Sequence, residues 1–248
     1  MKPEITRPPS VRIAFRTFGR TLRHGYDNLF TLGIASVLWL LCTAPIVFIV
    51  LFVVLALPVT GFGFFLLLLG GLIVGIGPPS AALHRIVQPM TEERASSWRV
   101  FWQHLRADAR WSLRLVGTLL LVLLLAEMNR SFYSQSPNNN LYLLTGFFLV
   151  IILVWLAIML YAIPMALRQV EIVLRTTLRN AAILTLANLP GAAVSLVLLF
   201  ISSLILVVIP PLFLLLPGWI ALWSEENVRL LLVSSGHIAP DEFADRQA

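Results

Sequence analysis

A chain of 248 residues with 58% hydrophobic and only 12% charged residues is too apolar for a soluble globular domain with a solvated surface. Its formal charge of +6 would indicate a nucleic-acid partner in a soluble protein, but here the basic residues stand beside long apolar runs, so we expect no nucleic acid. The composition predicts an all-α, polytopic membrane protein in contact with the lipid bilayer. The single cysteine, Cys42, cannot form an intramolecular disulfide.

Residues 1–29 form a basic segment that we predict to lie on the cytoplasmic face. On a helical wheel one sector is apolar and an adjoining sector is basic. The apolar sector holds Val11, Phe15, Phe18, Leu22 and Tyr26, and the basic one holds Arg12, Arg16, Arg20 and Arg23. Such a helix lies in the headgroup plane. The apolar run that follows is far longer than the h-region of a signal peptide, so we expect it to stay as a membrane anchor.

A single membrane domain, residues 30–232, is predicted to follow, with a polar cytoplasmic tail at 233–248. A helix needs about 20 apolar residues to cross a hydrocarbon core of roughly 30 Å. About six stretches meet this requirement. The predicted spans are residues 30–57, 62–76, 113–128, 141–163, 181–209 and 212–232.

The basic residues then predict the orientation of these spans. With six spans, every Lys and Arg except Arg130 falls on one side. Cytoplasmic loops are enriched in Lys and Arg, so we place the N-terminus and the C-terminus in the cytoplasm.

Two further segments repeat the basic amphipathic pattern, one before the third predicted span and one before the fifth. The first has Trp98, Phe101, Trp102, Leu105 and Ala109 on one face, beside Arg99, Arg106, Arg110 and Arg114. The second groups Leu167, Val170, Val173, Leu174 and Leu178 away from Arg168, Arg175 and Arg179. The recurrence suggests a unit of one interfacial helix and two spans, repeated three times.

These arginines have two interpretations. They fix the topology and meet anionic lipid headgroups, or they form a cytoplasmic basic collar that docks a soluble partner. The collar would consist of Arg12, Arg16, Arg20, Arg23, Arg99, Arg106, Arg110, Arg168, Arg175 and Arg179.

Ionisable residues in the predicted spans are the usual functional candidates in a membrane protein. Glu127 stands at the outer end of a span with Arg130 one turn later, which favours an interfacial ion pair. The pairs His24 with Asp27 and His104 with Asp108 have helical spacing, but two ligands do not make a metal site. No hydrolase, zinc-protease or ATPase motif is present in the sequence. We therefore predict no enzyme and no catalytic, cofactor-binding or metal-ligating residues.

Helix irregularities are the remaining candidates for a solute pathway, because broken helices can expose backbone groups to a substrate. The candidates are Thr43, Pro45, Asn188, Pro190, Ser202 and Ser203. The alternative is that these residues only kink and pack the helices. Gly71 and Gly75 form a small-residue motif that predicts close helix packing.

Several short stretches, in this order, resemble the bacterial YesL family. They are residues 38–47 (Leu-Trp-Leu-Leu-Cys-Thr-Ala-Pro-Ile-Val), 76–83 (Ile-Gly-Pro-Pro-Ser-Ala-Ala-Leu), 101–106, 178–181, 188–190 and 216–219. The resemblance implies a protein of the bacterial plasma membrane, some of whose relatives are associated with carbohydrate uptake, and it transfers no catalytic residue. The chain departs from the family by about 30 apolar residues before residue 78, so the resemblance leaves open whether residues 48–77 complete two full spans with their flanks.

Three functions remain open from the sequence. The first is a transport-associated membrane component for carbohydrate uptake that works with other transport subunits. The second is a structural or assembly subunit, including a homo-oligomer, and the third is a stand-alone permease for small solutes.

Overall fold

The computed structural model describes residues 10–56, 62–94, 96–136 and 139–236, and this part of the chain contains ten helices and no strand. The protein is therefore an all-α, polytopic helical membrane protein, as predicted. The helices are α1 (Ser10–Asp27), α2 (Leu29–Ala56), α3 (Phe62–Thr91), α4 (Arg99–Ala107), α5 (Ala109–Ser134), α6 (Asn139–Leu167), α7 (Leu174–Ala187), α8 (Leu189–Val208), α9 (Pro210–Phe213) and α10 (Leu216–Ser234).

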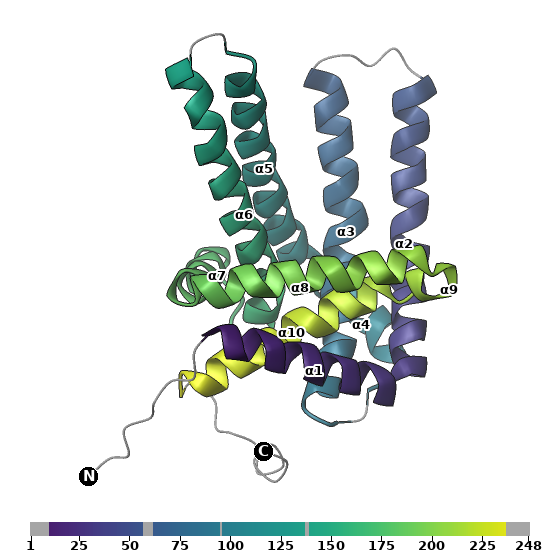
Figure 1. The fold of residues 1–248 in the computed structure, drawn as a ribbon. Helices are drawn as coiled ribbons and strands as arrows, with labels where there is room; N and C mark the ends of the chain where they lie inside the picture. The colour runs from purple at the N-terminus through teal and green to yellow at the C-terminus, as the bar shows by residue number, and fades with distance from the viewer. Residues whose placement is uncertain (1–9, 57–61, 95, 137–138, 237–248) are drawn as a thin grey trace, which may run out of the picture.

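Two long antiparallel hairpins stand side by side, α2 with α3 and α5 with α6 (Figure 1). Close approach of α2 and α3 depends on glycine, because Gly71 lies directly against the side chain of Val50. One turn further along, the Thr43 hydroxyl donates a 2.8 Å hydrogen bond to the carbonyl oxygen of Gly75. In the second hairpin, Trp155 Nε1 donates to the carbonyl oxygen of Leu119 at 2.9 Å.

Three helices, α1, α8 and α10, lie across one end of the hairpins and form what we term the crossed layer (Figure 1). The centre of this layer is α10, which contacts α1, α2, α3, α6 and α8. The hydrophobic core lies here as well: Leu222 of α10 packs with Ile86 of α3 and Phe101 of α4, while Val228 packs with Ile158 of α6. Packing inside the protein is thus concentrated at one end of the hairpins.

Five helices in the described residues are long and apolar enough to cross a membrane, compared with the predicted number of about six. The candidates are Leu29–Val53, Leu66–Thr91, Ala109–Ser134, Leu141–Leu167 and Leu189–Val208. The predicted second span, 62–76, continues as helix to Thr91, and the predicted fifth span, 181–209, divides at Asn188 into α7 and α8. The predicted sixth span, 212–232, is not a candidate, because α10 carries Glu225, Glu226 and Arg229 and lies inside the protein.

The eighth helix is apolar enough to span a bilayer, yet it lies across the hairpins in Figure 1. A bilayer crossed by α2, α3, α5 and α6 would therefore have α8 near its plane. The outer face of α8 is apolar, and its residues Phe200 and Val208 are 70% and 71% exposed. This face suits contact with lipid.

The three predicted amphipathic segments have different structures. Helix α1 exposes the predicted apolar residues Phe15 and Tyr26 and packs through the small side chains Ala14 and Thr17. In α4, the predicted surface residue Phe101 is fully buried. In the third segment, α7 begins only at Leu174. The two long helices that follow it, α8 and α10, lie across the hairpins and do not form a third hairpin (Figure 1). The predicted threefold repeat therefore holds for the first two units and changes in the third.

Candidate functional site

The candidate site is a pair of adjacent carboxylates on α10. Glu225 and Glu226 are both completely buried. Consecutive residues on a helix point about 100° apart, so the two side chains meet different neighbours. Burial of a carboxylate is costly unless cations and hydrogen-bond donors surround it. Each of these two carboxylates forms an ion pair with an arginine from another segment of the chain.

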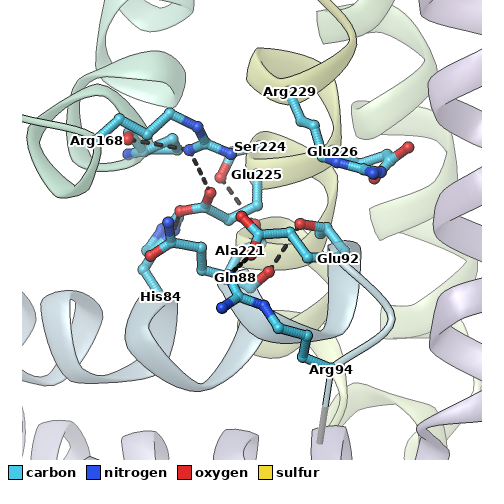
Figure 2. A network of polar contacts seen from close by, with 12 residues as sticks. His84, Gln88, Glu92, Arg94, Arg168, Ala221, Ser224, Glu225, Glu226 and Arg229 are labelled. Carbon is cyan, nitrogen blue, oxygen red and sulfur yellow. Dashed lines mark hydrogen bonds and ion pairs between the residues drawn. The ribbon is translucent and has the colours of Figure 1, made fainter. Parts of the chain in front are cut away.

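Glu225 joins the two hairpins through its two oxygens (Figure 2). Its Oε1 lies 3.0 Å from Nδ1 of His84, which belongs to α3 of the first hairpin. Its Oε2 accepts a 2.6 Å hydrogen bond from Nη1 of Arg168, which directly follows α6 of the second hairpin. Burial raises the pKa of Glu225, but the charge of Arg168 and the contacts with His84 and Arg168 outweigh burial, so the pKa lies below its ordinary value.

Arg168 is itself held in place and incompletely satisfied. Its Nη1 also donates to the carbonyl oxygen of Pro164 at 3.1 Å, so the guanidinium bridges the end of α6 and the Glu225 carboxylate. Its buried Nη2 has no hydrogen-bond partner. An unsatisfied buried donor beside a buried carboxylate is costly, and such costs are concentrated at functional sites.

Glu226 faces the other side of α10 and pairs less tightly. Its Oε1 lies 3.4 Å from Nη1 of Arg20, which belongs to α1, and its Oε2 lies 3.7 Å from Nη1 of Arg229. Oε2 accepts no hydrogen bond although it is buried. The two carboxylates thus connect α10 to α1, α3 and the end of α6.

The residues around the pair fix α10 against α6 and α8. The Asn227 amide donates to the Tyr161 hydroxyl at 3.2 Å and also contacts the Ser195 hydroxyl. That hydroxyl accepts a 2.8 Å hydrogen bond from Trp223 Nε1. These bonds hold the helix that carries Glu225 in one register.

A second polar cluster surrounds Asp108, between α4 and α5. The predicted pair forms, with His104 Nδ1 3.0 Å from Asp108 Oδ2. Arg85 Nε donates to the same oxygen at 3.0 Å, and Trp111 Nε1 donates to Oδ1 at 2.9 Å. Burial raises the pKa of Asp108, but these hydrogen bonds and the charges of Arg85 and His104 bring the pKa below its ordinary value.

The other predicted pair does not form, because Asp27 lies 3.8 Å from Arg23 in an ion pair and no contact with His24 is seen in the described residues. Over those same residues, no group of three or more His, Cys, Asp or Glu side chains is placed to hold a metal ion.

The predicted solute-pathway residues lie in three separate places. Thr43 and Pro45 lie on α2, where Thr43 bonds to Gly75 and the helix continues through Pro45. Asn188 caps the junction of α7 and α8, its amide donating to Leu184 at 2.9 Å, with Pro190 at the start of α8. Ser202 accepts a 3.0 Å hydrogen bond from Trp219, and Ser203 next to it is half-buried. No hydrogen bond among the described residues joins these three places.

The predicted basic collar is divided by the structure. Arg20 and Arg168 turn inward to the α10 carboxylates. The other eight remain exposed: Arg12, Arg16, Arg23, Arg99, Arg106, Arg110, Arg175 and Arg179. The inward pair therefore serves the buried site, and the exposed eight keep the predicted surface role open.

Glu225, Glu226 and Arg229 were not among the site residues predicted from the sequence. The signal was present, because two adjacent carboxylates interrupt a stretch that is otherwise apolar enough to read as a span. Ionisable residues in such a stretch are functional candidates by default. Their partners His84 and Arg168 lie 141 and 57 residues away in the chain, a proximity that no local pattern indicates.

Residues 32–130 match the family described as "Protein of unknown function, DUF624". The matched segment covers most of α2, all of α3 and α4, and most of α5, and it includes His84 and Asp108. The chain matches no curated protein and no solved structure. The match places the first hairpin and the Asp108 cluster within a known family segment, whereas Glu225 lies outside it.

Proposed function

We propose that this chain is a YesL-type component of a bacterial solute-uptake system, with carbohydrates as the substrate class, and that it acts together with other subunits in the plasma membrane. Two observations support the family: the six YesL-like stretches of the sequence and the DUF624 match over residues 32–130, which contains three of those stretches. Both chain termini face the cytoplasm under this proposal, because nearly all Lys and Arg residues then fall on that side.

The observation that carries the proposal is the junction at Glu225. A transport component must couple an event at the cytoplasmic face to a rearrangement of its spans. One buried carboxylate contacts His84 of the first hairpin and Arg168 at the end of the second. Because α10 contacts α3 of the first hairpin and α6 of the second, a displacement of α10 would change the packing of both hairpins at once. The contacts of Glu225 with His84 and Arg168 therefore lie where a movement at the cytoplasmic face would be transmitted to the membrane-spanning helices.

The exposed arginines of α1, α4, α5 and α7 support a partner at the same end of the molecule. Their side chains are exposed, and they would offer a basic surface to an acidic soluble subunit. The crevice between α2 and α3 is apolar and has a volume of only about 20 Å³, so it offers no polar path for a solute at that place. We therefore favour an accessory subunit over a stand-alone permease.

Gentle detergent purification from the native membrane, with native electrophoresis and mass spectrometry, tests the proposal. We expect stoichiometric recovery of an ATPase or a solute-binding protein. We also expect cells carrying Glu225→Gln to lose uptake while the chain stays in the membrane, and cells carrying Glu127→Gln, which changes a partly exposed carboxylate of α5 that pairs with Arg130, to keep it. Recovery of the chain alone or as a homo-oligomer, with unchanged uptake in Glu225→Gln cells, would reject the proposal and favour a structural subunit.

A further inference from the structure

Helix α4 exposes two tryptophans and two arginines on one side. Trp98, the N-cap residue of α4, already has helical backbone angles. It is 48% exposed and Trp102 is 49% exposed, and the side chains of Arg99 and Arg106 are exposed as well. Successive residues of a helix point about 100° apart, so the tryptophans, four residues apart, share a side, and the arginines, seven apart, lie beside them. We term these four residues the α4 surface.

The opposite side of α4 is packed inside the protein. Phe101 is fully buried in the hydrophobic cluster that also contains Ile86 of α3 and Leu222 of α10. Val100 and Leu105 pack against the same cluster. The large apolar side chains of α4 other than the two tryptophans are therefore used in the core.

This orientation distinguishes α4 from α1, although the sequence of each shows a basic amphipathic pattern. A helix that lies on a bilayer inserts a broad apolar face into the acyl boundary. Helix α1 has such side chains available, because Phe15 and Tyr26 are 57% and 81% exposed. Helix α4 presents only Trp98 and Trp102 in this way, beside arginines. Contact with another protein therefore suits the α4 surface better than contact with lipid.

The charge of this region indicates that such a partner is acidic. Arg99, Arg106 and Arg110 are exposed, and they form no ion pair with any residue that the structure describes. From residue 95 to residue 126 the sequence has a single acidic residue, Asp108, which is buried and hydrogen-bonded within the protein. No exposed carboxylate of this segment balances the three guanidiniums. An acidic patch on a partner would complement them.

The residue types of the α4 surface are typical of the strongest contacts between proteins. Tryptophan and arginine are enriched among the interface residues whose loss lowers affinity most. The Arg99 guanidinium lies 5.9 Å from the centroid of the Trp98 ring, within cation–π range. This contact restricts both side chains before a partner binds, which lowers the entropic cost of binding.

Helix α4 lies at the end of the hairpins that carries the crossed layer, and it is connected to the junction at Glu225 (Figure 1). Leu222, which shares the buried cluster with Phe101, lies three residues before Glu225 on α10. Helix α4 also packs on α3, which carries His84, the contact of Glu225 in the first hairpin. A displacement of α4 would therefore change the packing around both members of this contact.

We propose that the α4 surface is the docking site of a soluble cytoplasmic subunit whose own surface has an acidic patch beside an apolar pocket. The indole rings of Trp98 and Trp102 enter the pocket, and Arg99 and Arg106 pair with the carboxylates of the patch. The inference rests on the proposed transport role, because it assigns the surface on which the partner of that proposal binds.

Site-specific photo-cross-linking of the full chain in native membranes tests the inference. The photoreactive residue p-benzoylphenylalanine replaces Trp98 in one variant and Phe15, exposed on α1, in a matched control. We expect the variant at position 98 to cross-link to the same acidic subunit that co-purifies with the unmodified chain. The control at position 15 should form lipid adducts and not this product.

Charge variants that carry the photoreactive residue at position 98 then identify the contact. Arg106→Glu should lower the yield of the cross-linked subunit by at least about tenfold, because like charges then face each other. Arg99→Glu is an independent reversal on the same surface and should act in the same direction. Arg106→Lys keeps the charge and should retain most of the yield, and Arg12→Glu, a reversal on α1, should leave it unchanged. Each variant changes an exposed side chain and should unfold at about the wild-type temperature.

Other results would overturn the inference. Adducts at position 98 with lipid alone, or with a second copy of the chain, would assign the α4 surface to the bilayer or to a homo-oligomer. An undiminished yield in both Arg106→Glu and Arg99→Glu would exclude the charge contact, and an equal decrease in Arg12→Glu would assign docking to the basic residues as a whole. A subunit that co-purifies but does not cross-link at position 98 would reject the docking site and leave the proposed function intact. The absence of any co-purifying subunit would reject the proposed function and this inference together.

Discussion

The hairpins and the crossed layer are held together by different forces. Far from the layer, the hairpins expose large apolar side chains such as Phe48 and Leu143, at 71% and 73%, and their helices meet through small residues and single hydrogen bonds. In the layer, Glu225 and Glu226 are completely buried and pair with arginine side chains. Lipid tails are as apolar as leucine, so burial gives little drive for helices to associate within a bilayer. The stability of the hairpins therefore depends mainly on close packing of their helices, and that of the crossed layer depends also on its buried ion pairs.

The largest expected effect is at Glu225. Replacing Glu225 by Leu leaves the Arg168 guanidinium buried without its counter-charge, and breaking a buried pair in this way costs about 3–5 kcal/mol. Thermal unfolding in detergent, monitored by circular dichroism, should show a strong loss of stability. Glu225→Gln keeps hydrogen-bonding atoms and should lose less.

A matched control for this change lies in the second hairpin. Glu127 pairs with Arg130, and both side chains are partly exposed, at 47% and 34%. Exposed ion pairs contribute little, so Glu127→Gln should unfold at nearly the wild-type temperature. An equal loss in Glu127→Gln and Glu225→Leu would mean that the two regions do not differ in their dependence on charge.

The next effect tests shape in the first hairpin. Gly71→Leu forces a side chain into Val50, and overpacking of this kind costs about 1–3 kcal/mol. The neighbouring Gly70→Leu has nothing within 4 Å of the added Cβ and should be tolerated. The same unfolding assay distinguishes the two. If both variants unfold alike, close packing of α2 on α3 does not hold the hairpin.

This difference between the regions also explains what the sequence could predict. Hydropathy indicated the four hairpin helices, because a span is a local property of about 20 residues. The Gly71 motif and the Arg12 to Tyr26 wheel likewise depend only on spacing within one helix. The all-α membrane class followed from the same patterns.

The crossed layer could not be predicted in this way. Residues 212–232 are long and apolar enough to predict a span, but Glu225 within them is paired with His84 and Arg168, which are distant in the chain. The break at Asn188 has a local polar signal, which the sequence analysis assigned to a kink or a solute pathway and not to a change of helix direction. Helix α8 crosses the hairpins because it packs on α1 and α10. The hydrophobic periodicity of a single helix does not indicate such contacts.

Acid should have a smaller effect, through the buried carboxylates Glu225 in the crossed layer and Asp108 between α4 and α5. The pKa values of Asp108 and Glu225 lie below their ordinary values in the folded protein. Their contribution to stability is therefore fully present above the unfolded pKa of about 4 and is lost as the pH falls through the lower folded values. We expect thermal stability to be flat from about pH 7 to 5 and to fall as the pH drops below about 4.

Asp108→Asn isolates one of these groups. The variant should be less stable at neutral pH, because Arg85 and His104 lose their anion, and its stability should fall less steeply in acid. A variant whose stability falls as steeply as that of the wild type would exclude Asp108 as a source of the acid sensitivity.

The smallest effect separates a packing role from a solute pathway in the hairpin. Thr43→Val keeps the shape of the side chain and removes its hydrogen bond to the Gly75 carbonyl, and such a bond between helices in a membrane contributes about 0.6 kcal/mol. Ser203→Ala, at a half-buried position on α8, should change stability by less. If Thr43 only packs, cells carrying Thr43→Val should keep their uptake despite this small loss of stability. Lost uptake with unchanged unfolding would instead place Thr43 on the solute pathway, and the hairpin would then carry function as well as shape.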